Sequence, residues 1–210
     1  MDKQKRMASL VKGRKILDIG FAQAPNKYLQ GEIIGIDIQK TKKPENYSKV
    51  LRLNLNTDRI PYPDNTFDTV LCGDVIEHVE NPSQLLRECN RVLKKQGKLI
   101  LSTPHANHWW TTLHNWIFPF IKDRDVGEHL SNWTKLDMIR LLKKNGFKVK
   151  KIYGVSFDIP LLKLKINFVI YHMFSLVLIY ECIKEKKPIT GVFFGKNGKI
   201  KLAAQKRLTI

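Results

Sequence analysis

Two carboxylates and a glycine near the start of the chain have the spacing of a nucleotide-binding unit. Asp18 and Gly20 end one apolar run, and Asp37 ends a second apolar run 19 residues after Asp18. A carboxylate at the end of the second strand of a βαβ unit is placed to accept hydrogen bonds from ribose hydroxyls. A glycine after the first strand lets the backbone approach a ligand closely. The spacing therefore predicts a nucleotide site, and by itself it also fits a dehydrogenase that binds NAD.

The turn after the first run departs from the glycine-rich pattern of dinucleotide sites. It reads Gly20-Phe21-Ala22-Gln23-Ala24, so the full G-x-G-x-x-G is missing. Without those glycines a pyrophosphate group has a weaker cradle, whereas a ligand without pyrophosphate needs that cradle less. Alanine disfavours positive φ, so Ala22 and Ala24 should weaken ligand binding wherever the turn requires such backbone.

A second group that could do chemistry is the D-x-x-E-H sequence formed by Asp74, Glu77 and His78. If this stretch opens a helix, residues three or four apart share one face. Two carboxylates and an imidazole on one face could bind a divalent metal ion. The alternative is that His78 packs and hydrogen-bonds behind a ligand pocket.

Histidines and aromatic residues are concentrated in residues 106–133. This segment follows a predicted strand, so it should lie over the carboxyl ends of the sheet, where open α/β sheets bind ligands. His105 and His129 flank it and are candidates for a base or for a group that orients a substrate. Its tryptophans could line an apolar pocket or enter a membrane interface, and they include Trp109, Trp110 and Trp116.

These side chains need a scaffold of alternating strands and helices. Apolar runs separated by turn signals predict strands at residues 15–20, 33–37, 50–53, 69–72, 98–102 and 147–153. Capping residues predict helices that begin at Asn81-Pro82 and at Thr134 and end before Gly97 and Gly146. The alternation predicts a parallel sheet with helices on its faces.

Two features near the C-terminus stand apart from this scheme. Asn197-Gly198 predicts a hairpin turn between residues 192–194 and 200–202. Residues 166–180 carry no formal charge, and as a helix they would span roughly 22 Å, short of the roughly 30 Å of a bilayer core. With lysines on both sides, this segment predicts either a helix that docks on a membrane or a buried cap.

The composition predicts one cytoplasmic domain with a packed core. The chain has 210 residues, of which 43% are hydrophobic and 27% are charged, so we expect a single α/β domain over residues 1–210. A net charge of +18 favours nucleic acid, an anionic membrane or a phosphorylated substrate, unless the lysines only form a solvated surface. Three cysteines without a Cys-x-x-Cys pair argue against a disulfide framework or a cysteine zinc site. The first dozen residues lack a long apolar stretch, which predicts no signal peptide and a cytoplasmic location.

The whole pattern resembles the class I S-adenosylmethionine-dependent methyltransferases, in particular the group that includes the ubiquinone-biosynthesis O-methyltransferases. The matching stretches are KILDIG, GIDI, LNLNTDRIPYPDNTFDTVLCGDVIEHV, LLRECNRVLKKQGKLILSTP, EHLSNWT and LLKKNGF. The resemblance implies a Rossmann-like α/β fold, with a mostly parallel seven-stranded sheet, helices on both faces and a C-terminal helical or hairpin cap. It makes residues 106–133 a lid insertion and residues 160–187 an apolar cap or membrane-docking segment.

The resemblance also implies S-adenosylmethionine as the cofactor and assigns positions to it. Asp18 and Gly20 would face its methionine part, Asp37 would bind its ribose, and Asp74 would lie beside the methyl donor. The further positions implied to contact the cofactor are Phe21, Ile38, Asn54, Leu55 and Gly73. Some family members bind a metal at E-x-x-E-H and others with E-H-V bind none, so a metal at Asp74, Glu77 and His78 is left open but not expected. Asn54 has a second interpretation as a residue that only stabilises its own turn.

The expected activity is methyl transfer to a small-molecule or lipid-linked acceptor. Displacement at a sulfonium has a good leaving group, so positioning does most of the work, and a base is needed only if the acceptor loses a proton. His129, which matches a histidine of the family, is the first candidate for that base, followed by His105. The alternatives are an RNA methyltransferase, which the charge favours, and an inactive binding protein, which Ala22 and Ala24 permit. Residues 166–180 suggest peripheral contact with the inner face of the membrane.

Overall fold

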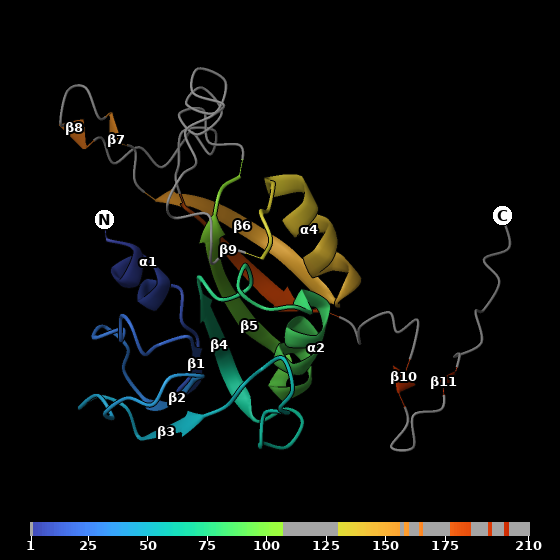
Figure 1. Ribbon diagram of the computed structural model, residues 1–210. Coiled ribbons are helices and arrows are strands. Elements are labelled where there is room, and N and C mark those ends of the chain that lie inside the picture. The colour runs from blue at the N-terminus through green and yellow to red at the C-terminus, as the bar shows by residue number, and fades with distance from the viewer. Residues whose placement is uncertain are drawn as a thin grey trace, which may run out of the picture.

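Seven strands form one sheet in the order β3-β2-β1-β4-β5-β9-β6 (Figure 1). The computed structural model describes residues 2–106, 130–155 and 177–185, together with the short pairs 158–159, 164–165, 193–194 and 200–201. The strands of the sheet are β1 Lys15–Ile19, β2 Glu32–Asp37, β3 Lys49–Arg52, β4 Phe67–Gly73, β5 Leu93–Pro104, β6 Phe147–Val155 and β9 Val177–Lys184. β9 runs antiparallel to both neighbours, and the other pairings in this sheet are parallel. The predicted sheet and its six predicted strands are confirmed.

The strand order reverses at β1, and this reversal creates the site. From β1 the chain builds β2 and β3 toward one edge, and it then returns to place β4 on the other side of β1. Ile19 is in register with Ile36 of β2 and with Cys72 of β4. The three loops that follow these strands therefore begin side by side. In open α/β sheets, a crevice for ligands forms at the carboxyl ends of the strands at such a point.

Helices cover both faces of the sheet, as predicted. α1 (Lys3–Ser9) lies on one face, and α2 (Pro82–Val92) and α4 (Lys135–Lys144) lie on the other (Figure 1). Successive residues of β1 serve opposite faces: Ile16 packs in the cluster that contains Met7 of α1, whereas Leu17 packs in the cluster that contains α2 and α4. This alternation follows from the two-residue period of a strand. Cys72 and Cys89 are buried and unpaired in the second of these clusters, as the sequence indicates.

The predicted helix over residues 166–180 is wrong at its C-terminal end, because Val177–Tyr180 belong to β9. Leu178, Ile179 and Tyr180 are each at most 1% exposed. A strand with neighbours on both sides and packing on both faces needs apolar residues throughout, so its sequence lacks the alternation of a half-buried strand. These residues are buried in the sheet and cannot dock on a membrane. Residues 166–176 lie outside the described part of the chain. Among the described residues, no helix is long and apolar enough to span a bilayer.

Two short antiparallel pairs complete the described elements. β10 (Phe193–Phe194) pairs antiparallel with β11 (Ile200–Lys201), as the predicted hairpin requires, and the predicted turn at Asn197-Gly198 lies outside the described residues. β7 (Asp158–Ile159) pairs with β8 (Leu164–Lys165), and this pair is not among the predicted elements.

Both predicted helix starts carry the expected side-chain caps. The Asn81 side chain accepts a hydrogen bond from the backbone of Gln84, and Pro82 occupies the first turn of α2. The Thr134 hydroxyl accepts a hydrogen bond from the Asp137 backbone N–H at 3.2 Å and starts α4. Each cap satisfies a backbone N–H that has no partner within its helix.

We expect Thr134→Ala to lower the free energy of unfolding by about 1 kcal/mol, because the substitution removes the cap of α4. The buried face of α4, which includes Met138 and Leu142, would stay intact, so the fold should survive. Chemical denaturation measures the change, and Thr134→Ser, which keeps the hydroxyl, should stay close to the parent. Equal stability of the alanine and serine variants would show that the cap contributes nothing.

Candidate functional site

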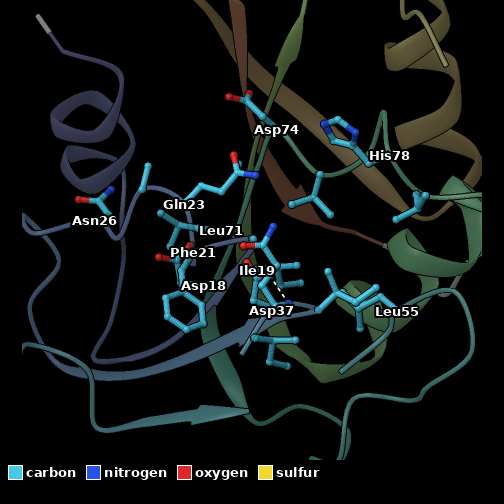
Figure 2. Close-up of a pocket in the computed structure, with 18 of the residues that line it drawn as sticks. Asp18, Ile19, Phe21, Gln23, Asn26, Asp37, Leu55, Leu71, Asp74 and His78 are labelled. Carbon is cyan, nitrogen blue, oxygen red and sulfur yellow. Dashed lines mark hydrogen bonds between the residues drawn. The ribbon is translucent and has the colours of Figure 1, made fainter. Parts of the chain in front are cut away.

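A pocket of about 350 Å³ lies at the carboxyl ends of β1, β2 and β4 (Figure 2). Its walls come from the loops after these strands, from residues 53–56 after β3 and from α1. This volume is at the lower end of the range of small-molecule pockets. The pocket occupies the crevice that the strand order creates.

The residues assigned to the cofactor all line this one pocket. They are Asp18, Gly20, Phe21, Asp37, Ile38, Asn54, Leu55, Gly73 and Asp74. They come from four separate strand ends, so the structure brings together positions that are far apart in the sequence. Their lining of one pocket is an observation, and their role in binding stays a prediction.

Asp37 is held at the end of β2 by two backbone N–H groups. Its Oδ2 accepts a hydrogen bond from Ala22 at 2.9 Å, and its Oδ1 accepts one from Gln39 at 2.8 Å. A carboxylate has about four acceptor positions, so each oxygen can still accept a hydrogen bond from a ligand. The two backbone contacts fix the direction of the carboxylate without using up its capacity.

The first turn needs a glycine only at its first position. Gly20 has a φ of +81°, and a Cβ built there would lie 2.1 Å from Cγ2 of Val75. Ala22 and Ala24 are absent from the residues with positive φ in the described chain. The two alanines therefore do not strain this turn, and the expected weakening from positive φ does not apply.

Asp18 is a buried carboxyl group with a partner that the sequence did not predict. Its side chain lines the pocket although only 6% of the residue is exposed. The Tyr47 hydroxyl, from the loop before β3, donates a hydrogen bond to its Oδ2. Burial raises the pKa of Asp18 to about 7; the hydrogen bond from Tyr47 acts in the opposite direction, and the charge of Asp37 adds to the rise.

Asp74 is fixed beside the pocket by a residue of α1 and a residue of β5. It has a φ of +52°, Lys3 forms an ion pair with its Oδ2, and the Ser102 hydroxyl donates to its Oδ1 at 2.7 Å. Lys3, Gln4 and Met7 line the pocket. Sequence reasoning missed them because α1 has only seven residues and precedes the first strand.

The D-x-x-E-H sequence does not gather its three side chains. Residues 76–78 form a turn, and the next helix starts only at Pro82, so the assumed helical face does not exist. Asp74 and His78 line the pocket, but Glu77 does not. Glu77 is 2% exposed, its Oε2 accepts a hydrogen bond from Thr103 at 3.2 Å, and burial raises its pKa to about 7. Within the described ranges no three His, Cys, Asp or Glu side chains are placed to hold a metal ion.

Of the two base candidates the structure describes only His105. It directly follows β5 and is not among the residues that line the pocket. His129 and residues 107–128 of the predicted lid lie outside the described chain. Among the described histidines, His78 lines the pocket.

Asn54 and two apolar residues form the far end of the pocket. The Asn54 side chain accepts a hydrogen bond from the Asn56 backbone at 3.1 Å, so it stabilises its own turn, as its second interpretation predicts. Leu55 follows it, and Ile38 is 55% exposed although it is a large apolar residue. An exposed apolar side chain at a pocket edge can pack against the flat face of a base.

Comparisons with known proteins agree with this arrangement. A family model described as a methyltransferase domain matches residues 17–101. A ubiquinone biosynthesis O-methyltransferase of Pelagibacter ubique is 26% identical over 170 residues, which cover 71% of this chain and 68% of that protein. A demethylmenaquinone methyltransferase of Bacillus licheniformis is 32% identical over 114 residues, which cover 47% of this chain and 48% of that protein. The matches thus span from about half to two thirds of these relatives.

Solved structures share the fold. A SAM-dependent methyltransferase of Thermotoga maritima superposes with a TM-score of 0.67 at 17% identity and covers 87% of each chain. One from Archaeoglobus fulgidus has a TM-score of 0.66 at 18% identity and covers 87% of this chain and 91% of that one. The fold of this chain is therefore the one that these solved structures have.

Proposed function

We propose that this chain, which belongs to the class I S-adenosylmethionine-dependent methyltransferases, transfers the methyl group of that cofactor to a small-molecule or lipid-linked acceptor. The observation that carries the proposal is the meeting of Asp37, Gly20 and the apolar pair Ile38 and Leu55 at one pocket. A carboxylate suits ribose hydroxyls, a glycine permits close backbone approach, and apolar side chains suit an adenine ring.

The donor groups of the pocket fit an adenosyl sulfonium. Asp18 and Asp74 both provide carboxyl groups to the pocket, and carboxylates favour a cationic ligand over a pyrophosphate. The turn at residues 20–24 also lacks the glycines that would cradle a pyrophosphate. Both features support the methyltransferase assignment over a dehydrogenase.

When bound, the cofactor supplies an electrophilic methyl group on a good leaving group. The residues of this chain then have mainly positioning tasks. Asp37 orients the ribose, and Ile38 and Leu55 hold the base. A proton has to be removed only from an acceptor such as a hydroxyl. For that task His78 lines the pocket, while His129 and His105 stay candidates from the sequence.

The acceptor is proposed to be of the quinone-precursor type. Support comes from the relatives, because two of those reported above carry the names of ubiquinone and menaquinone pathway enzymes. Residues 177–180 cannot dock on a membrane, because they are buried in β9. They therefore give no support to a lipid-linked acceptor.

RNA is the second candidate acceptor, and surface charge favours it. Beyond the net charge of +18, five lysines are exposed where α4 ends and along the edge strand β6: Lys143, Lys144, Lys148, Lys150 and Lys151. A basic surface of this kind attracts phosphate backbones without reading their sequence.

Transfer of a labelled methyl group into a cell extract tests the function. The extract is fractionated after the reaction into lipid, small-molecule, RNA and protein pools. Label in the lipid or small-molecule pool supports the proposal, and label only in RNA supports the second candidate. Binding of S-adenosylmethionine without any transfer would favour an inactive binding protein.

Lys3→Ala should weaken binding of S-adenosylhomocysteine about tenfold. Lys3 pairs with Asp74 in the pocket wall, and from there its ammonium group can also pair with the carboxylate of that ligand. Binding of 5′-methylthioadenosine, which lacks the amino-acid end, should not change. Calorimetry with both ligands measures the difference. Lys5→Ala is the matched control, since Lys5 is exposed on the same helix and does not line the pocket. An equal loss for both ligands would contradict this role.

A further inference from the structure

Tyr47 is a fully enclosed residue beneath the cofactor pocket. It lies in the loop between β2 and β3 and is 1% exposed. Its ring lies 5.2 Å from the ring of Phe21, and both rings sit over Gly35 of β2. A Cβ on Gly35 would lie 2.7 Å from Phe21 and 3.0 Å from Tyr47. The absence of a side chain at Gly35 therefore leaves the space in which both rings pack against β2.

The hydroxyl of Tyr47 connects β1 with the loop that follows it. It accepts a hydrogen bond from the Asn26 backbone N–H at 3.1 Å and donates one to Oδ2 of Asp18. Asn26 N can only donate, so the Tyr47 oxygen accepts that hydrogen bond and the single hydrogen of the hydroxyl is left for the ionised Asp18 carboxylate.

Asn26 extends this connection to the rest of the site. Its side-chain amide donates to the Gln4 carbonyl of α1 at 3.0 Å, and its own carbonyl accepts from the Asn46 side chain at 3.1 Å. The loop after β1 is thus held by the backbone of α1 and by side chains from the loop that carries Tyr47. Glycines are scarce in this loop, and these contacts define its path instead.

We propose that Tyr47 is a positioning residue for the methyl donor, which holds the Asp18 carboxylate and the loop after β1 in the arrangement that a cationic cofactor requires. The proposal rests on the proposed function, since it concerns the same pocket. Asp18 lines that pocket, and a carboxylate there attracts the sulfonium and ammonium charges of the cofactor. Tyr47 acts on the ligand through Asp18 and does not line the pocket itself.

Other charged or titratable groups surround Asp18, and the test has to separate them. Asp37 lies on β2 and Cys72 on β4, and both interact electrostatically with Asp18. Lys3, Asp74 and His78 line the same pocket from α1 and from the loop after β4. A comparison within an Asp18→Asn background removes the contribution of Asp18 and leaves that of the others.

The test is the pH dependence of S-adenosylmethionine binding by Tyr47→Phe, measured by calorimetry from pH 6 to pH 9. Loss of the donated hydrogen bond raises the pKa of Asp18, because that bond stabilises the carboxylate. The pH at which affinity rises should therefore be higher in the variant by about one pH unit. Binding near pH 7 should then be about fivefold weaker and should recover at pH 9. In the Asp18→Asn background, Tyr47→Phe should add little further loss. Tyr153→Phe is the matched control, because it removes the hydroxyl of a buried tyrosine that donates to Glu181 at 3.0 Å and does not line the pocket.

Each other outcome has a distinct meaning. If the parent protein does not bind S-adenosylmethionine at any pH, the proposed function itself is wrong. If the parent binds and the Tyr47→Phe curve superposes on the parent curve, the role of Tyr47 is overturned. A loss that is equal at all pH values, or equal with and without Asp18, also overturns it, because it indicates a structural effect only. Thermal melting of each variant confirms that the folded state is compared.

Discussion

Replacing Asp37 with alanine abolishes measurable binding of S-adenosylmethionine if the pocket is used as proposed. The backbone N–H groups of Ala22 and Gln39 orient the carboxylate, which would accept hydrogen bonds from two ribose hydroxyls. Hydrogen bonds to a charged group contribute about 1.5 to 3 kcal/mol each, so losing two should reduce affinity at least a hundredfold. Calorimetry of the variant and the parent at the same pH measures this effect.

Two controls separate binding from folding in this experiment. Asp37→Asn keeps one acceptor oxygen and the shape of the side chain, so its affinity should lie between those of the parent and the alanine variant. Asp64→Ala removes a carboxylate that lies on the surface, 66% exposed beside Arg91, and should bind like the parent. Parent-like affinity of Asp37→Ala, with an intact thermal transition, would refute the site map.

The sheet could be predicted from the sequence because its strands are short apolar runs with clear ends. The same runs located the site, since Gly20, Asp37 and Gly73 stand where three predicted strands stop. In a parallel sheet the ends of neighbouring strands lie at one edge, so a linear pattern is sufficient to place these residues together.

The partners of those residues could not be predicted, because they depend on the paths of loops. Tyr47 lies 29 residues from Asp18, and Lys3 lies 71 residues from Asp74. Neither has a spacing or cap signal that links it to its partner. Only the packing of the loop before β3 and of α1 against the sheet brings these pairs together.

Two interpretations fail for a common reason, because both assume a helix where the chain forms another structure. A helix over residues 166–180 cannot include its last four residues, since Val177–Tyr180 form part of a strand with neighbours on both sides. The D-x-x-E-H sequence places its side chains on one face only if it opens a helix after β4, and it forms a turn instead, in which Glu77 does not line the pocket. Local composition does not distinguish these cases, because tertiary packing decides them.

Gly20→Ala should destabilise the protein by about 3 kcal/mol and impair cofactor binding. An alanine at a φ of +81° costs about 1 to 2 kcal/mol. Its Cβ would also lie 2.1 Å from Cγ2 of Val75 and 3.3 Å from the carbonyl oxygen of Gly73, and such overpacking adds about 1 to 3 kcal/mol. Denaturant unfolding measures the stability, and calorimetry measures the binding.

The two contributions can be separated by combining Gly20→Ala with Val75→Ala. Truncation of Val75 removes the atom that the new Cβ would strike, but it leaves the cost of positive φ unchanged. The double variant should therefore be more stable than the sum of the two single effects predicts, with a coupling of about 1 to 2 kcal/mol. Strictly additive effects would mean that Val75 moves aside freely and that backbone conformation alone requires this glycine. Coupling would mean that a glycine is required at position 20 both by its φ angle and by its contact with the loop after β4. The cofactor is proposed to bind between these two places, the ends of β1 and β4.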